Sequence, residues 1–321
     1  MAENTNLKEA SVETFRHEVL NCWRHLPDKA LFFVLLGAWA ALFQFLGNSV
    51  FGYIDTASLF KWTYHIFDTS PDDEHGKLIP FAVVVLLWWK RQELLAVPKR
   101  IWWPALILLV LGALLHVFGY VIQFPNVSVV GFFVGLYGLT GVIWGRGWLE
   151  TTFFPMILFI FCVPLGTLSD SITFPMRMLV TKISVGIADS FLGIPVIRDG
   201  SQIRHAQDMF TYEVAAACSG IRSLISLLAL TTIYGFLTFK TLWKRVIIIA
   251  VAFPLAIVGN VARITTVIVA AEAFGQDAGA FVENKLGFIT FAVAISCILL
   301  LGYLLREGDG STAIPLEPKT A

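Results

Sequence analysis

Apolar residues along this chain gather into long runs that short polar stretches separate. A helix of about 20 apolar residues crosses the hydrocarbon core of a bilayer. One shorter run, residues 78–89, would be only about 18 Å long as a helix, so it could cross only with help from its flanks. Counting it, the sequence predicts eight membrane-spanning helices: 30–48, 78–89, 102–124, 128–147, 151–168, 218–239, 246–271 and 285–305.

The connection over residues 169–217 is much longer than the others. From Met176 to Phe191 apolar and polar residues mix at helical spacing, which predicts an amphipathic helix on the membrane surface. After it, the turn residues Asp199-Gly200 and an alternating pattern up to Val214 predict a short hairpin. The predicted fold is therefore all-α: a polytopic membrane helical bundle with a short extracytoplasmic amphipathic helix and hairpin before the helix that carries Cys218.

Composition agrees with a membrane protein. Hydrophobic residues make up 57% of the chain and charged residues 14%, against roughly 25% charged residues in a soluble domain, and the mean hydropathy is +0.74. The formal net charge is zero, so nothing indicates a nucleic-acid partner. The four cysteines form no CxxC pair, which argues against a metal cluster or a disulfide framework: Cys22, Cys162, Cys218 and Cys297.

Lysine and arginine residues favour the cytoplasmic side of a membrane. If eight spans alternate, the basic segments fall on one side and the acidic segments on the other: 16–29, 90–100 and 240–245 are basic, whereas 55–74 and 272–283 are acidic. We therefore expect both termini in the cytoplasm. The expected parts of the chain are a cytoplasmic N-terminal segment (1–29), one transmembrane domain (30–306) and a flexible cytoplasmic tail (307–321).

A thiol and two arginines lie in or beside the apolar runs, where ionisable groups are costly and usually functional. Cys218 is expected at the outer start of its span, where a helix N-terminus favours the thiolate. Arg222 follows one turn deeper on the same face. Arg263 lies roughly 12 Å from the outer end of its own span, and its long side chain can reach outward. Asn260 is one turn below it and could orient it.

These groups permit acyl transfer. A thiolate can attack a scissile carbonyl and form a thioester, while a guanidinium stabilises the oxyanion or binds a substrate carboxylate. Arginine stays charged near pH 7, so it cannot act as an ordinary base. Water or an amine would then resolve the thioester, which gives hydrolysis or transpeptidation.

Three motifs together resemble the signature of the exosortase/archaeosortase family. They are Ala217-Cys218-Ser219-Gly220 with Arg222 and Leu224, then Gly259-Asn260 with Arg263, and Gly287 in the third motif. The resemblance extends over roughly 75–291 and includes His75 to Pro80, Phe154-Pro155 to Pro164, and Gly193 to Gly200. It implies that Cys218 is the nucleophile and Arg263 a proton donor or transition-state stabiliser. Arg222, Ser219 and Asn260 are then candidate substrate contacts.

The third motif departs from the family pattern. Exosortases have a histidine four residues before its glycine, whereas this chain has Glu283 at that position. Either Glu283 takes the third role differently, or another group supplies an imidazole. His205, thirteen residues before Cys218 and on the same predicted side, is the candidate for the second option.

The resemblance also implies a substrate class, a location and no cofactor. Family members process exported proteins that carry a C-terminal sorting signal of the PEP-CTERM type: a short motif, a transmembrane helix and a basic tail. The expected location is the bacterial inner membrane, with the active site facing outward and no metal or organic cofactor. Two alternatives remain open, namely a multi-pass transporter whose arginines bind an anionic solute and a homologue that binds sorting signals without cutting them.

Overall fold

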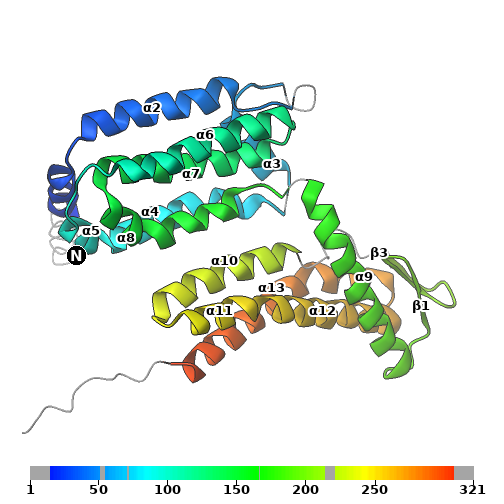
Figure 1. Cartoon of the computed structure of the whole chain (residues 1–321). Helices are drawn as coiled ribbons and strands as arrows, with labels where there is room; N and C mark the ends of the chain where they lie inside the picture. The colour runs from blue at the N-terminus through cyan, green and yellow to red at the C-terminus, as the bar shows by residue number, and fades with distance from the viewer. Residues whose placement is uncertain (1–14, 51–54, 71, 166, 214–220, 307–321) are drawn as a thin grey trace, which may run out of the picture. The chain divides into compact units, whose positions relative to one another are not determined.

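The computed structural model describes residues 15–50, 55–70, 72–165, 167–213 and 221–306 (Figure 1). The chain divides into two compact units, Met1–Ser169 and Asp170–Ala321. The described part is helical except for one small sheet, which agrees with the predicted all-α class. Five helices are long and apolar enough to cross a membrane, which identifies a polytopic membrane protein: Lys29–Leu46, Trp103–Val121, Pro125–Trp144, Leu242–Phe274 and Gly287–Leu304. The count of eight spans stays a prediction.

The first unit is built of helices that run back and forth between two ends. Residues 15–25 are helical and precede the labelled elements. The elements that follow are, in chain order: α2 (Lys29–Leu46), α3 (Leu59–Thr69), η1 (Glu74–Lys77), α4 (Ile79–Trp89), α5 (Arg91–Ala96), η2 (Trp103–Ala105), α6 (Leu106–Val121), α7 (Pro125–Trp144), α8 (Arg146–Ile157) and η3 (Leu158–Cys162).

Helices α6 and α7 lie side by side and approach each other closely through glycines (Figure 1). A Cβ atom at Gly112 would lie 2.6 Å from the Gly131 carbonyl oxygen, and one at Gly131 would lie 2.6 Å from the Gly112 carbonyl oxygen. Small residues permit this approach, and the gain is close packing, which drives association where no water is present.

The two ends of the first unit differ in chemistry. At one end Asp73 is buried and its carboxylate accepts a hydrogen bond from the Leu165 amide at 2.7 Å, while the side-chain amide of Asn126 donates to the Pro164 carbonyl. At the other end the Trp144 indole donates to the Pro27 carbonyl at 3.1 Å. This second end carries six basic side chains: Lys29, Lys90, Arg91, Lys99, Arg100 and Arg146. Two other lysines, Lys61 of α3 and Lys77 of η1, lie with the acidic residues of their own segment, and Lys77 pairs with Asp68 at 2.9 Å. The alternation of the first five spans stays a prediction.

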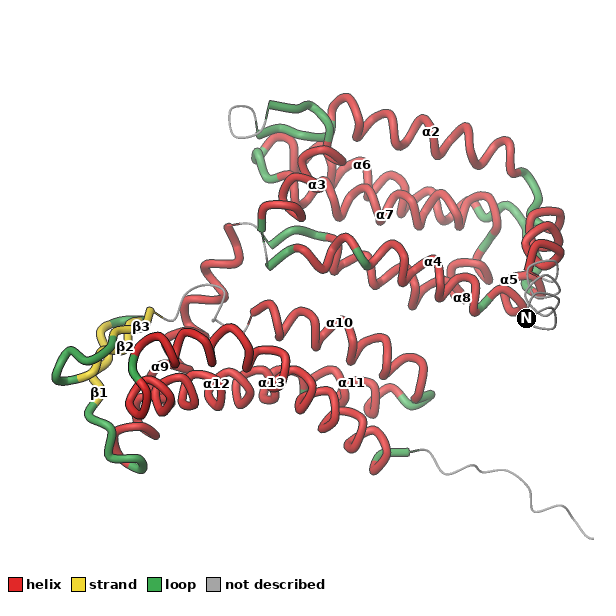
Figure 2. Tube along the Cα trace, turned by 180° about the vertical axis from the view of Figure 1, so that it is seen from behind, coloured by secondary structure: helices red, strands yellow, loops and turns green. Residues whose placement is uncertain are grey.

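The second unit contains a long helix, a small sheet and a bundle. Its elements are: α9 (Thr167–Ser190), β1 (Val196–Asp199), β2 (Gln202–His205), β3 (Thr211–Glu213), α10 (Ile221–Thr238), α11 (Leu242–Ala250), α12 (Ala252–Phe274) and α13 (Gln276–Leu304). The strands form an antiparallel sheet in the order β1-β2-β3, drawn yellow in Figure 2. Asp199 pairs with Gln202 across a two-residue turn in which Gly200 has φ +60°. The predicted hairpin is therefore present, and a third strand extends it.

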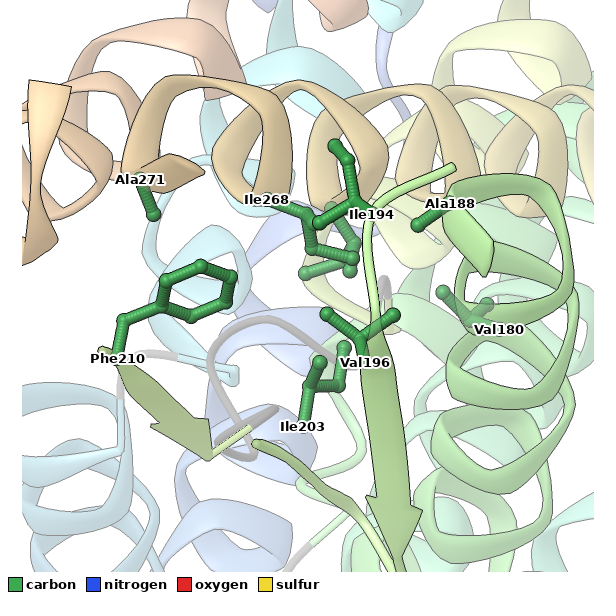
Figure 3. Packing of buried hydrophobic residues seen from close by; sticks show 9 residues of the cluster. Val180, Ala188, Ile194, Val196, Ile203, Phe210, Ile268 and Ala271 are labelled. Atoms are coloured by element: carbon green, nitrogen blue, oxygen red, sulfur yellow. The ribbon is translucent and has the colours of Figure 1, made fainter. Parts of the chain in front are cut away.

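The sheet packs with α9 on the C-terminal half of α12 (Figure 3). Val180 and Ala188 of α9 meet Ile268 of α12, and the buried Ile203 and Phe210 fill the space beneath the strands. A second apolar cluster joins α10, α11, α12 and α13. The amphipathic helix predicted from Met176 is part of α9, which begins at Thr167 and contains Pro175.

Three predicted spans differ from the helices that contain them. The span predicted over 151–168 is α8 followed by the 3-10 helix η3, because Pro155 lacks an amide hydrogen to continue the α-helical ladder. The span predicted over 246–271 covers parts of two helices, α11 and α12, which are separated at Val251. Pro254 has no amide hydrogen, so the Ala250 carbonyl lacks its helical donor there. The last span, predicted over 285–305, agrees with the candidate span Gly287–Leu304. The helix that carries it, α13, begins earlier, at Gln276.

Candidate functional site

Helices α12 and α13 form an antiparallel pair that Gly275 connects, with φ +89° at the turn. Arg263 projects from α12 toward α13, where its Nη2 donates a hydrogen bond to the Glu283 backbone carbonyl at 2.9 Å. Its guanidinium also borders Gly287, since a Cβ there would lie 3.6 Å from Nη1. The arginine of the second motif and the glycine of the third motif are therefore in contact.

A small cavity of about 40 Å³ opens beside this arginine. Its polar wall comes from three helices: Ser223 from α10, Asn260 and Arg263 from α12, and Thr290 from α13. Asn260 is buried, and the Thr290 hydroxyl donates to the Gly287 carbonyl at 3.1 Å. A cavity needs roughly 10–15 Å³ and several polar partners to hold a water molecule, so this one has room for water or for a small polar group of a substrate.

This arrangement presents a positive charge and neutral hydrogen-bonding groups inside an apolar bundle. Such a setting strengthens electrostatic interactions, because no bulk water screens them. A guanidinium whose position is fixed by a backbone carbonyl can stabilise an oxyanion without reorganising at the moment of reaction. The cavity therefore suits a reaction in which negative charge develops on a carbonyl oxygen.

Glu283 lies within α13, not in a loop before it. Its backbone carbonyl binds Arg263, and its carboxylate lies close enough to Tyr212 to help raise the pKa of that phenol, after the larger effect of burial. Tyr212 of β3 donates a hydrogen bond to the Gln276 carbonyl in the first turn of α13. Glu283 thus lies between Arg263, the predicted catalytic arginine, and the three-stranded sheet.

His205 lies on β2 and is buried, with 2% of its surface exposed. The Gln207 amide donates to its Nδ1 at 3.2 Å, so a neutral ring carries its proton on Nε2. That nitrogen faces the Glu272 carboxylate of α12 at 3.1 Å, outside hydrogen-bond geometry. Both ring nitrogens of His205 already face a neighbour. To act as a base, His205 must therefore move one nitrogen away from the Gln207 amide or the Glu272 carboxylate.

Cys218 and Ser219 lie outside the described residues, as does the side chain of Arg222. The structure brings together Arg263, Asn260, Gly287 and the Glu283 backbone. Sequence reasoning assigned no role to Ser223 and Thr290, which share the cavity wall. Their only signal in the sequence was position: Ser223 is five residues after Cys218, and Thr290 is three residues after Gly287.

Comparison with known families supports the significance of this region. The model of a protein family described as transmembrane exosortase matches residues 62–300. The match includes all three motifs and every residue that lines the cavity. No match is found among curated proteins or among solved structures.

Proposed function

The chain belongs to the transmembrane exosortase family, and from this premise we propose that it is a membrane-embedded cysteine peptidase or transpeptidase. Its substrates would be exported proteins with a C-terminal sorting signal of the PEP-CTERM type. The observation that carries the proposal is the cavity beside Arg263, where residues of the second and third motifs meet the helix that begins three residues after Cys218.

In this proposal the Cys218 thiolate attacks the scissile carbonyl carbon and forms a C–S bond. Arg263 stabilises the negative charge that develops on the carbonyl oxygen. When the tetrahedral intermediate collapses, the C–N bond breaks and the departing amine gains a proton, which leaves a thioester. Water or an acceptor amine then attacks the thioester and regenerates the thiol.

The departing amine needs a proton donor, and Arg263 keeps its protons near pH 7. Two candidates remain for this third role. Glu283 is supported by its backbone contact with Arg263, and His205 by its position on the strand β2 that precedes β3 and the cysteine. The substrate contacts would be Ser219, Arg222 and Asn260, of which Asn260 lines the cavity.

The location proposed for the enzyme is the bacterial inner membrane, with both termini in the cytoplasm and the cavity nearer the outer face. The support comes from charge. Basic side chains gather at one end of the first unit, and Lys240, Lys244 and Arg245 follow the end of α10 that lies far from Cys218.

The test is processing of an exported reporter that carries a Pro-Glu-Pro-like motif, a transmembrane helix and a basic tail. We expect co-expression with the wild-type chain to shorten the reporter, and Cys218→Ala to abolish the shortening while the variant is still inserted in the membrane. Cys218→Ser is the conservative variant of the same position. It replaces the thiol with a hydroxyl of similar size, which does not readily form an anion.

The outcomes separate the alternatives. Cleavage that persists in Cys218→Ala rules out the thioester mechanism. A wild-type chain that binds the reporter tail in a pull-down but leaves it intact is a non-cutting homologue. A chain that neither binds nor cuts reporters with several tail motifs, yet takes up an anionic solute, is a transporter.

A further inference from the structure

A cavity at the basic end of the first unit combines apolar walls with two cations. It has a volume of about 270 Å³ and lies among residues 15–25, α4, α5 and α8. Most of its wall is apolar, including Leu26, Leu87 and Trp148, whereas Arg91 and Lys99 supply positive charge. Two other apolar cavities in the described part of this unit have no lysine or arginine in their walls.

The charge of Lys99 has no acidic partner among the described residues. Its ammonium donates to the backbone carbonyls of Leu94, Leu95 and Val97 at 2.9–3.2 Å. These contacts satisfy its hydrogen atoms and leave its positive charge uncompensated. Burial lowers the pKa of Lys99, and no acidic neighbour opposes that effect.

Arg91 is held in place with part of its hydrogen-bonding capacity unused. Its Nη2 pairs with Glu18 at 2.9 Å, and its guanidinium lies 4.7 Å from the centre of the Trp88 ring. Its Nε is buried and has no hydrogen-bond partner among the described residues. Glu18 pairs with Arg91 but does not line the cavity, and no acidic residue is among the described residues of its wall, so the wall carries a net positive charge.

The helical residues 15–25 cover one side of the cavity, which Cys22 lines. Phe15 packs on Trp88 with ring centres 5.0 Å apart, and Trp23 packs on Phe33 at 5.8 Å. Phe15 and Trp23 are nonetheless about half exposed, at 56% and 50%. An exposed aromatic face beside basic residues is typical of a helix that lies in the headgroup region.

We propose that this cavity binds one anionic phospholipid, with its phosphate at Arg91, where the positive charge of Lys99 also attracts it, and with part of an acyl chain between Leu87 and Trp148. Basic pockets between membrane helices on the cytoplasmic side bind anionic headgroups, and arginine suits phosphate through its planar set of donors. The bound lipid would tie residues 15–25 to α4 and α5. This proposal does not depend on the peptidase proposal, because its readout is binding.

The experiment uses the full-length protein in neutral detergent micelles. We expect phosphatidylglycerol to raise the melting temperature and to stay bound in native mass spectrometry, whereas phosphatidylcholine does neither. Lys99→Gln should weaken phosphatidylglycerol binding roughly fivefold, which corresponds to about 1 kcal/mol for each basic residue at an anionic surface. Arg146→Gln is the matched control, because Arg146 lies at the same end of the unit but does not line the cavity and is exposed.

A second variant keeps the test decisive if Lys99→Gln does not fold. Cys22→Phe fills the cavity from residues 15–25 and keeps both cations, so it should also lose the lipid. Equal retention of phosphatidylglycerol and phosphatidylcholine would overturn the proposal. Glycerol 3-phosphate that produces the same thermal shift would overturn it as well, since the site would then be an anion site without an acyl chain.

Discussion

Arg263 is fixed by geometry that a lysine cannot reproduce. Its guanidinium reaches the Glu283 carbonyl through Nη2 and leaves Nη1 beside Gly287. A lysine has a single ammonium on a flexible stem and cannot hold both positions at once. We expect Arg263→Lys to lower the cleavage rate of the reporter by roughly 10²–10³-fold, the usual cost of losing one oxyanion donor, measured as initial rates with purified protein.

The control for this substitution is Arg204→Lys on the exposed surface of β2. It makes the same chemical change in the same unit and should leave the rate unchanged. If Arg263→Lys cleaves as fast as the wild type, then a point charge is sufficient, and the fixed fork of donors has no part in the mechanism.

The pair of His205 and Glu272 gives a second test at the residue scale. The sequence predicts that His205→Ala stops processing. In the structure the same change removes the ring that the Glu272 carboxylate faces, and the Glu272 side chain is only 33% exposed. If the pair positions the sheet on α12, Glu272→Gln should lower both the melting temperature and processing, as His205→Ala does. The stability loss should be about 1–3 kcal/mol, the cost of a buried polar group without its partner.

A catalytic base would behave differently. Glu272→Gln would then process the reporter nearly normally, whereas folded His205→Ala would be inactive at every pH. That outcome would assign His205 the third role and remove Glu283 from it.

At the scale of elements, the contact between β3 and α13 connects the three-stranded sheet to the site. Tyr212 packs against Gly279, where a Cβ atom would lie 2.3 Å from its hydroxyl oxygen. β3 ends at Glu213, five residues before Cys218, so Tyr212 restricts where that segment begins. We expect Gly279→Ala to displace Tyr212 and to reduce processing and the alkylation rate of Cys218 together.

Gly186→Ala in α9 is the matched control, since no atom lies within 4 Å of the added Cβ. It should leave both rates unaltered. If Gly279→Ala slows processing but leaves the alkylation of Cys218 unchanged, the contact acts on the substrate and not on the cysteine.

The paired helices α6 and α7 make a prediction about stability alone. Gly131→Ala places a Cβ atom 2.6 Å from the Gly112 carbonyl, so the helices must separate. Such overpacking typically costs about 1–3 kcal/mol, and thermal unfolding in detergent should show a lower melting temperature. Gly37→Ala in α2 meets no atom within 4 Å and should be neutral; equal melting temperatures for the two variants would contradict this account of the packing.

Sequence reasoning was most accurate where one physical effect dominates. The run predicted over 102–124 became a helical segment from Trp103 to Val121, because almost every residue in it is apolar. It failed where local chemistry competes with hydropathy. The first turns of α13 contain Gln276, Asp277 and Glu283, so they resemble a polar loop although their backbone is helical.

The site shows the same division. Arg263 and Asn260 could be identified because a charged or amide side chain in an apolar run requires a reason. Ser223 and Thr290 could not, since hydroxyl groups are common in membrane helices and usually bond to their own backbone. Only the packing of α10, α12 and α13 brings these hydroxyls to the cavity beside Arg263.

At the scale of the whole molecule, the family match over residues 62–300 extends across both compact units. All three motifs that carry the proposed chemistry, around Cys218, Arg263 and Gly287, fall in the stretch of sequence assigned to the second unit. The further resemblance around His75 and Pro164 falls in the first unit. The enzyme proposed here therefore requires both units. Eight alternating spans with cytoplasmic termini predict which loops of each unit face the cytoplasm and which face outward.

Site-directed labelling tests that orientation. The background for this test replaces all four native cysteines by alanine, so that the introduced thiol alone can react. Ser201→Cys lies in the β1–β2 turn, and Lys240→Cys follows α10. Eight spans with cytoplasmic termini place Ser201 outside and Lys240 inside, because the two positions lie on opposite sides of one span. We expect a membrane-impermeant maleimide to label Ser201→Cys in intact spheroplasts and Lys240→Cys only after lysis. The reverse pattern would invert the topology and place the cavity toward the cytoplasm, where exported proteins could not be processed after translocation.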